Sequence, residues 1–133
     1  MTAVDTNILV RLLTQDEPAQ AAIAKAMFAH EQIWIAKTVL LETEWVLRRA
    51  YGFNRQSIQI AFTMLMGLPN VHVEDEVIFP AVLALADQGI DFADAVHLES
   101  RPNDALLASF DATFIKRARR AGVRDVVLAN RRS

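Results

Sequence analysis

Acidic residues in this chain follow apolar stretches, at positions where they could bind a cation. Asp5 comes directly after Ala3-Val4, and Asp111 follows the apolar stretch from Ala105 to Ser109. A carboxylate at the carboxyl end of a buried strand lies where open α/β folds place their ligand crevice. Because an unpaired carboxylate is costly to remove from water, a cation or a set of hydrogen-bond donors must compensate it. Helix capping is the alternative role for both residues.

Glu42 is a third candidate, near the start of a helix expected from Thr38 to Tyr51. It has no basic residue three or four positions later, so it lacks the partner that would explain it as half of a helical ion pair. Glu44 has such a partner in Arg48, which predicts an ordinary surface pair. A carboxylate near a helix amino terminus is favoured in its ionised form, as a ligand must be.

Asp91 and Asp94 stand three residues apart at the start of another expected helix. Asp91 suits the N-cap, whereas Asp94 either complements the helix dipole or serves as a ligand. If the first and fourth strands are neighbours, Asp5 and Asp111 meet at the point where the sheet reverses direction. Asp94 and Glu42 would complete the cluster from helices packed beside it. Four carboxylates without lysine or arginine among them would raise one another's pKa unless a divalent cation were bound.

The elements that must position these acids alternate between short apolar strands and helices. The expected strands cover residues 3–4, 33–36, 71–73, 105–109 and 126–128. The expected helices cover residues 8–13, 17–30, 38–51, 55–67, 76–88, 92–99 and 112–121. Short apolar strands separated by helices indicate a parallel sheet covered on both faces. The fold class is therefore α/β.

Length and composition predict one domain over residues 1–133. The chain is 53% hydrophobic, with four Gly and four Pro, and it contains no cysteine. Disulfides and thiolate metal sites are therefore excluded, and a reducing compartment is allowed. Neither a basic-then-apolar leader nor an apolar run of roughly 18 residues is present, so we expect a cytoplasmic protein without a membrane segment.

The net charge of −2 conceals an asymmetry along the sequence. Residues 101–133 contain eight Lys or Arg and three acidic residues, whereas residues 1–100 contain six Lys or Arg and thirteen acidic residues. Four of these bases fall within one expected helix: Lys116, Arg117, Arg119 and Arg120. They either approach an RNA phosphate backbone or form the solvated face of an amphipathic helix, and composition leaves both interpretations open. We expect the three histidines, Trp34 and Trp45 to be structural.

Four short motifs resemble, in order and spacing, the PIN-domain family, and in particular the VapC-like toxins of type II toxin–antitoxin pairs. They are Asp5-Thr6-Asn7, Thr38-Val39-Leu40-Leu41-Glu42, Phe92-Ala93-Asp94-Ala95 and Ser109-Phe110-Asp111. The resemblance covers essentially the whole chain. It implies a three-layer α/β/α sandwich with a short, mainly parallel five-stranded sheet, for which we expect the order 3-2-1-4-5.

The resemblance also implies a function, which is cleavage of RNA by a Mg²⁺-dependent endoribonuclease in which Mn²⁺ can substitute. The family's acids fall on Asp5, Glu42, Asp94 and Asp111, with Thr6, Asn7 and Ser109 as supporting polar groups. Asp5, Asp94 and Asp111 would hold the metal, and Glu42 a water or a second ion. Thr113 stands where many members carry a further acid, which leaves the second ion open. The alternative is a catalytically silent PIN-like module that binds RNA or protein.

Two partners are expected besides RNA, namely a second copy of the chain and a cognate antitoxin protein. The resemblance implies both. The helix after Asn54 carries more apolar residues than one buried stripe needs: Ile58 and Leu65 can face the core, whereas Ile60 and Met64 point away from it. Exposed apolar patches usually mark interfaces, so this surplus favours a homodimer.

Overall fold

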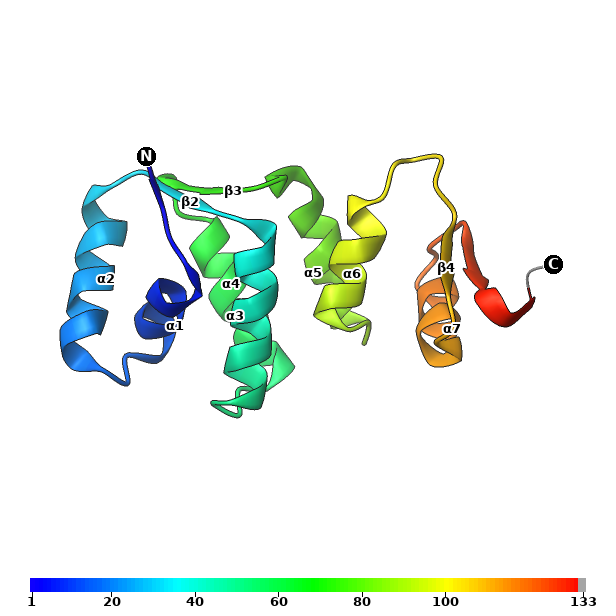
Figure 1. Ribbon diagram of the computed structural model, residues 1–133, viewed down its shortest axis with the longest axis horizontal. Coiled ribbons are helices and arrows are strands. Elements are labelled where there is room, and N and C mark those ends of the chain that lie inside the picture. The colour runs from blue at the N-terminus through cyan, green and yellow to red at the C-terminus, as the bar shows by residue number, and fades with distance from the viewer. Residues whose placement is uncertain (132–133) are drawn as a thin grey trace. The chain divides into compact units, whose positions relative to one another are not determined.

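The computed structural model describes residues 1–131 of the chain. The backbone forms two compact units, unit 1 from Met1 to Glu76 and unit 2 from Val77 onward (Figure 1). The predicted single domain over residues 1–133 is not tested by this division and stays a prediction. Among the described helices, none is long and apolar enough to cross a membrane.

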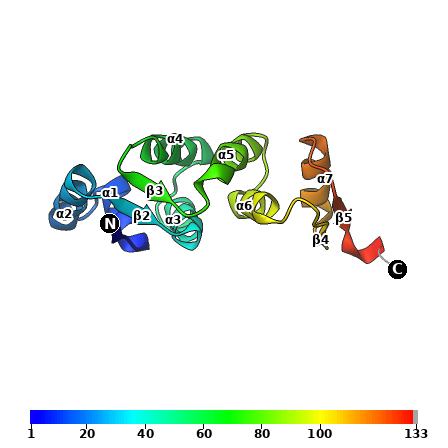
Figure 2. The same cartoon turned by 90° about the horizontal axis from the view of Figure 1, so that it is seen from above.

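Unit 1 contains three parallel strands and four helices (Figures 1 and 2). The strands are β1 (Thr2–Ala3), β2 (Ile33–Ile35) and β3 (Val71–Val73), in the order β1-β2-β3. The helices are α1 (Thr6–Thr14), α2 (Pro18–His30), α3 (Lys37–Arg49) and α4 (Arg55–Met66). Helix α1 packs against α2 and α3, and α4 packs against α3 and β3. The core includes Leu9, Ile33, Ile35, Leu40, Leu47 and Phe62.

Side-chain caps fix where the helices of unit 1 begin. The side chain of Asn54 accepts the N–H of Ser57 at 2.8 Å, as the sequence predicts for the start of α4. Glu17 caps α2, whose first residue is Pro18. Its side chain accepts the N–H groups of Ala19 and Gln20. These carboxylate and amide oxygens satisfy N–H groups that have no partner inside the helix.

Asp16 ties the end of α1 to the end of α3. Its carboxylate accepts hydrogen bonds from the Tyr51 hydroxyl at 2.6 Å and the Thr14 hydroxyl at 2.9 Å, and Arg11 pairs with it at 3.2 Å. These bonds favour the ionised form and lower the pKa of Asp16, with the Tyr51 bond as the largest cause. Asp16 therefore joins two helices of unit 1 through its charge.

The described part of unit 2, up to residue 131, contains two parallel strands and three α-helices, with short 3₁₀ turns at its start and after its last strand. The strands are β4 (Leu107–Ser109) and β5 (Val126–Leu128). The helices are α5 (Phe79–Asp87), α6 (Phe92–Ser100) and α7 (Ala112–Arg120), and the 3₁₀ turns are η1 (Glu76–Ile78), which begins at the last residue of unit 1, and η2 (Ala129–Arg131). Helix α5 packs against α6, and α7 packs against β4 and β5. Its core includes Phe79, Val82, Ile90, Ala95, Leu98 and Ala118.

The predicted helix over residues 76–88 is wrong in its first turn. The chain forms the 3₁₀ turn η1 there, and α5 begins only at Phe79. Pro80 lies at the start of α5, where its missing N–H costs nothing and its fixed φ is compatible with a first turn. A regular α-helix through this position would place the ring against the preceding turn, so the helix starts late.

The α/β class and the parallel strand directions are confirmed. The expected neighbours 3-2-1 and 4-5 are also confirmed, but the expected single five-stranded sheet is wrong, because the described strands form two sheets. Strand β1 has only two residues, Thr2 and Ala3, and both pair with β2. Only Val4 and Asp5 separate β1 from α1, which begins at Thr6, so β1 offers little backbone for a second ladder.

Two side chains of α3 differ from their expected surroundings. Glu44 pairs with Arg48 at 2.9 Å as predicted, but the pair is not an ordinary surface one, because Glu44 is only 5% exposed. Trp45, predicted to be a core residue, is 55% exposed. On a helix these neighbouring positions point in different directions, so the residue type alone did not indicate which of the two faces the interior.

The Asp16 network predicts a pH-dependent stability. Its contribution is fully present above the ordinary Asp pKa of 3.8 and is lost as the pH falls through the lowered folded value. Tyr51→Phe should therefore lower the melting temperature at pH 7, and the gap from the wild type should close in acid. Thermal melts from pH 7 to about pH 2 measure this. A gap of constant size would show that Asp16 ionisation is not its cause.

Candidate functional site

Asp5 stands between β1 and α1 as the N-cap of α1. Its Oδ1 accepts the N–H of Ile8 at 3.1 Å, and its backbone is extended. The capping role foreseen as the alternative for Asp5 is therefore confirmed. The side chain is exposed, and none of the described residues donates a hydrogen bond to Oδ2. One oxygen holds the carboxylate in place, and the other faces solvent.

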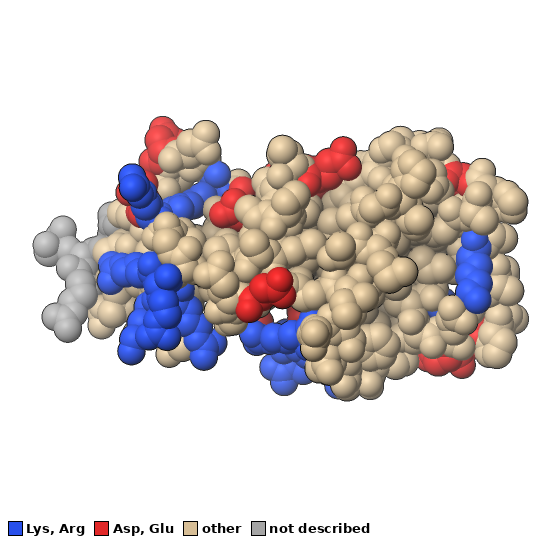
Figure 3. Space-filling view, turned by 180° about the vertical axis from the view of Figure 1, so that it is seen from behind, with Lys and Arg blue, Asp and Glu red and all other residues tan. Residues whose placement is uncertain are grey.

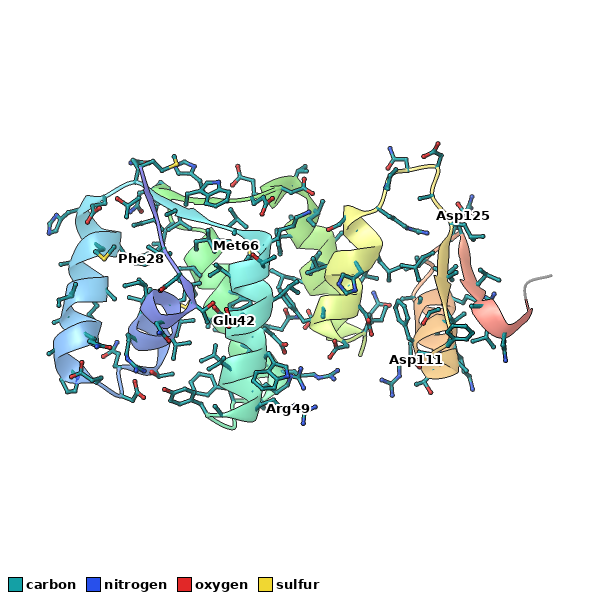
Figure 4. All side chains as sticks on the ribbon, viewed as in Figure 1. Phe28, Glu42, Arg49, Met66, Asp111 and Asp125 are labelled. Carbon is teal, nitrogen blue, oxygen red and sulfur yellow. The ribbon has the colours of Figure 1, made fainter. Side chains whose placement is uncertain are left out.

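Glu42 is joined to the same helix start. The hydroxyl of Thr6, the first residue of α1, donates to Glu42 Oε1 at 2.6 Å. Figure 4 shows the Glu42 side chain reaching from α3 toward the junction of β1 and α1. Because Thr6 follows Asp5 directly, the structure brings Glu42 close to the end of β1, as the sequence analysis expected.

A cleft of about 550 Å³ lies beside this junction in unit 1. Asp5 and Asn7 contribute its acidic and amide groups, and Arg11 and Gln20 contribute further polar ones. Its apolar lining comes from Ala3, Val4, Ile8, Ile23 and Met27. The predicted supporting residue Asn7 is thus placed next to the Asp5 carboxylate, in a groove formed by β1, α1 and α2.

Asp111 repeats in unit 2 the arrangement of Asp5. It follows β4 and caps α7, since its Oδ1 accepts the N–H of Phe114 at 3.0 Å. Its own N–H donates to Ser109 Oγ at 3.0 Å, so the predicted supporting residue Ser109 holds the Asp111 backbone. Figure 4 marks Asp111 at the start of α7. The side chain is exposed.

Asp94 and Asp111 line one small cavity of about 110 Å³. Its walls come from the loop before α6, from α6 and from α7, and its lining residues are Gly89, Ile90, Asp91, Asp94, Asp111, Thr113, Phe114 and Arg117. The sequence analysis predicted that Asp94 and Asp111 would lie together. The cavity confirms that proximity within unit 2.

The surroundings of Asp94 in this cavity raise its pKa. Partial burial is the largest cause that raises its pKa, and the neighbouring negative charge of Asp91 raises it further. His97 lowers it, and Asp111 raises it. A carboxylate in this position gains from a bound cation, since a cation offsets both the burial and the repulsion.

Two residues line this cavity although the sequence did not place them beside Asp94 and Asp111. Asp91 is the N-cap residue of α6, as expected, but its side chain makes no capping bond and the residue lines the cavity. Arg117 lines it as well, so the expectation of an acid cluster without lysine or arginine is wrong. Its spacing of four residues from Thr113, one helical turn, was the signal that could have placed it there.

The remaining bases of α7 divide by their contacts. Arg119 donates to the Val126 carbonyl at 3.1 Å and thereby joins α7 to β5. Lys116 and Arg120 are exposed and lie four residues apart on the solvated face. Figure 3 shows the Lys and Arg side chains gathered over this helix. Both earlier interpretations therefore stay compatible with the helix: a solvated face and an RNA-binding surface.

The donor set suits a hard divalent cation. The candidate ligands are carboxylates, which Mg²⁺ prefers, and the pKa of Asp94 is raised first by burial and then by the nearby charge of Asp91. Asp5 and Glu42 belong to unit 1, whereas Asp94 and Asp111 belong to unit 2. Within residues 1–131, no three acidic or histidine side chains come close enough to hold a metal together. The convergence of all four acids stays a prediction.

Comparison with known proteins gives one match. The family model described as PIN domain matches residues 2–120, which is most of the chain and includes all four predicted acids. No curated protein and no solved structure matches the sequence.

The raised pKa of Asp94 predicts that its charge destabilises the metal-free fold. Below the ordinary pKa of 3.8 the group is protonated in both states and costs nothing, and above its raised folded value the cost is complete. In EDTA, Asp94→Asn should therefore melt above the wild type at pH 7, and the two should converge near pH 3. Glu99→Gln, at a half-buried acid of the same helix outside the cavity, is the control. An Asp94→Asn protein that melts below the wild type at pH 7 would make this acid a structural one.

Proposed function

The chain belongs to the PIN domain family, and from this premise we propose that it is a divalent-metal-dependent endoribonuclease that acts as the toxin of a toxin–antitoxin pair. PIN domains are generally metal-dependent nucleases, and they typically use divalent metals. The substrate, the toxin role and the metal's identity go beyond this family-level statement and form the proposal.

One observation carries the proposal, namely that two predicted acids from different helices line the same cavity. Asp94 comes from α6 and Asp111 from the start of α7. Helix capping accounts for one oxygen of Asp111, whereas Asp94 lies in the first turn of α6, where its charge can complement the helix dipole but receives no capping role. Carboxylates that share a site repel each other, so their shared position supports a function that needs them there.

Asp5, Asp94 and Asp111 would hold Mg²⁺, with Mn²⁺ able to replace it, and Glu42 would hold a water or a second ion. When bound, the metal supplies Lewis-acid activation of the phosphate and of the attacking water. The chain's own groups orient the ligands: the Thr6 hydroxyl fixes one oxygen of Glu42, and Ser109 fixes the backbone of Asp111. Thr113 supplies no carboxylate, which favours one tightly held ion.

Nucleic acid as the substrate is supported by two features next to Asp111. The exposed bases Lys116 and Arg120 lie on α7, where they can contact phosphates. Phe110 is 83% exposed, although most large apolar side chains of the chain are covered, and it directly precedes Asp111. An exposed aromatic ring offers a stacking surface to an unpaired base, which is typical of proteins that bind single strands.

Loss of the strand-end carboxylates should abolish cleavage and leave the fold intact. Asp5→Asn and Asp111→Asn keep an amide oxygen that can cap α1 and α7. Each should lower the rate of RNA cleavage in Mn²⁺ by more than about 100-fold, the upper end of the loss seen for partners that only support a metal ligand. An RNA cleavage assay paired with thermal melts measures both effects. Asp125→Asn, at an exposed acid of unit 2 in a loop, is the control and should cut at the wild-type rate.

The same assay decides against the alternative function. A wild-type protein that binds RNA but does not cut it in Mg²⁺ or Mn²⁺ would support a catalytically silent PIN-like module. Cleavage that survives in Asp5→Asn or Asp111→Asn would remove that acid from the catalytic set. Mapping the cleaved ends in cellular RNA after a pulse of expression would then identify the target.

The protein is also proposed to form a homodimer through α4. Ile60 and Met64 are 55% and 70% exposed on one side of this helix, and Leu68 beyond its end is 41% exposed, whereas Ile58 and Leu65 are buried. Met64→Glu should therefore weaken self-association by at least about tenfold, equivalent to about 1.4 kcal/mol, without lowering the melting temperature. Sedimentation at micromolar concentration measures it. A wild-type protein that sediments as a monomer would contradict the dimer.

A cognate antitoxin is proposed to inhibit by occupying the acids. The cleft beside Asp5 has an apolar lining that includes Ile23, which is 61% exposed, so an apolar segment fits along it. A basic residue of that segment would then reach the carboxylates and compete with the metal. The protein encoded beside this one should reduce Mn²⁺ affinity by at least about tenfold in titrations of the complex. Undiminished Mn²⁺ binding would exclude this mode of inhibition.

A further inference from the structure

Arg117 differs from the other bases of α7 in its position. It lines the cavity that contains Asp94 and Asp111, whereas Lys116 and Arg120 do not. Its Nη1 donates to the Gly89 carbonyl at 3.2 Å, and Gly89 belongs to the same cavity wall. The side chain is therefore held at the cavity by a bond to the backbone, and the residue is exposed.

Arg117 does not neutralise the acids that surround it. Within residues 1–131 it forms no ion pair with Asp94 or Asp111, although all three line one small cavity. A guanidinium has five N–H donors in a planar fork, and the Gly89 carbonyl accepts from only one nitrogen. The remaining donors and the full positive charge are available to a ligand.

The sequence of α7 explains why this charge stays available. Thr113 precedes Arg117 by four residues, so the two lie on one face of the helix and both line the cavity. A carboxylate at position 113 would attract Arg117 into a helical ion pair. Threonine carries no charge, so Thr113 offers Arg117 no ion-pair partner within the helix.

We propose that Arg117 binds an oxygen of the scissile RNA phosphate and stabilises the negative charge that grows on it during hydrolysis. This inference rests on the proposed ribonuclease function and assigns a catalytic residue to it. The oxygen of the attacking water forms the new bond to phosphorus and releases one proton to solvent. The departing ribose oxygen takes the electron pair of the broken P–O bond and one proton from solvent, so the protons balance. Arg117 keeps all of its protons throughout. Its planar fork matches phosphate oxygens, and donors aimed at developing charge act mainly on the rate.

The test separates the chemical step from RNA binding. Arg117→Gln should lower the single-turnover rate at saturating RNA in Mn²⁺ by about 100-fold or more, because a donor that acts on the transition state is lost. RNA affinity in EDTA should fall by only about threefold, as for the loss of one phosphate contact. Arg117→Lys should match the wild-type affinity but recover only part of the rate, since an ammonium lacks the fork. Arg124→Gln removes an equivalent exposed charge outside the cavity and is the matched control.

The possible results are distinguishable. A saturating rate within about threefold of the wild type for Arg117→Gln, with wild-type cleavage intact, would overturn the role of Arg117 and leave the proposed function standing. If Arg117→Gln melts at a lower temperature than the wild type, the cleavage rate of Arg117→Lys tests the proposal instead. A wild-type rate for Arg117→Lys would overturn the role of the planar guanidinium. If neither the wild type nor Arg124→Gln cleaves RNA, the proposed function fails and this inference fails with it.

Discussion

Two carboxylates in this protein are fixed by the same physical constraint, which is that a helix begins directly after a strand and needs a cap. Asp5 accepts the N–H of Ile8, and Asp111 accepts the N–H of Phe114, at 3.1 and 3.0 Å. Each cap uses one oxygen and leaves the other toward solvent. The position of each carboxylate is thus set by the backbone before any ligand binds, which is the preorganisation that a metal site requires.

Around these caps, the other proposed site residues act through side chains that the caps position. Thr6 begins α1 because Asp5 caps it, and from there its hydroxyl holds Glu42 of α3. In unit 2, the start of α7 places Asp111 and Thr113 at the cavity that Asp94 enters from α6. Burial, and after it the negative charge of Asp91, raises the pKa of Asp94, and this residue belongs to the unit that also carries the basic helix. Under the proposed function, the acids of unit 2 would bind a cation and its bases a phosphate.

Much of this architecture follows from local sequence signals. The strands Val71–Val73 and Val126–Leu128 have the predicted boundaries, and the caps at Asn54 and Asp111 are where short polar side chains precede apolar periodicity. Local signals failed where long-range packing or the ring of one proline decides where an element begins or ends. The length of β1 depends on how soon Asp5 turns to cap α1, and the late start of α5 depends on Pro80.

The candidate site was predictable to the same degree. Asp5 and Asp111 follow β1 and β4, and Asp94 lies in the first turn of α6, because strand ends and helix starts are local features, whereas the convergence of the four acids stays a prediction. Arg117 was grouped with the other bases of α7, since its contact with the Gly89 carbonyl joins two segments that are far apart in sequence. The burial of Glu44 was missed for the same reason: sequence spacing shows its partner Arg48, but not which face of α3 the rest of unit 1 covers.

The central proposal is that Asp5, Asp94 and Asp111 hold one metal ion together. Calorimetric titration of Mn²⁺ into the wild type, Asp5→Asn and Asp111→Asn tests it most directly, with Asp125→Asn as the control. Both site variants preserve their helix caps, so a change in affinity reports the lost charge. The account predicts one binding event in the wild type that each site variant weakens by at least about tenfold. Wild-type Mn²⁺ affinity in Asp5→Asn, or two independent binding events lost separately in the two variants, would contradict it.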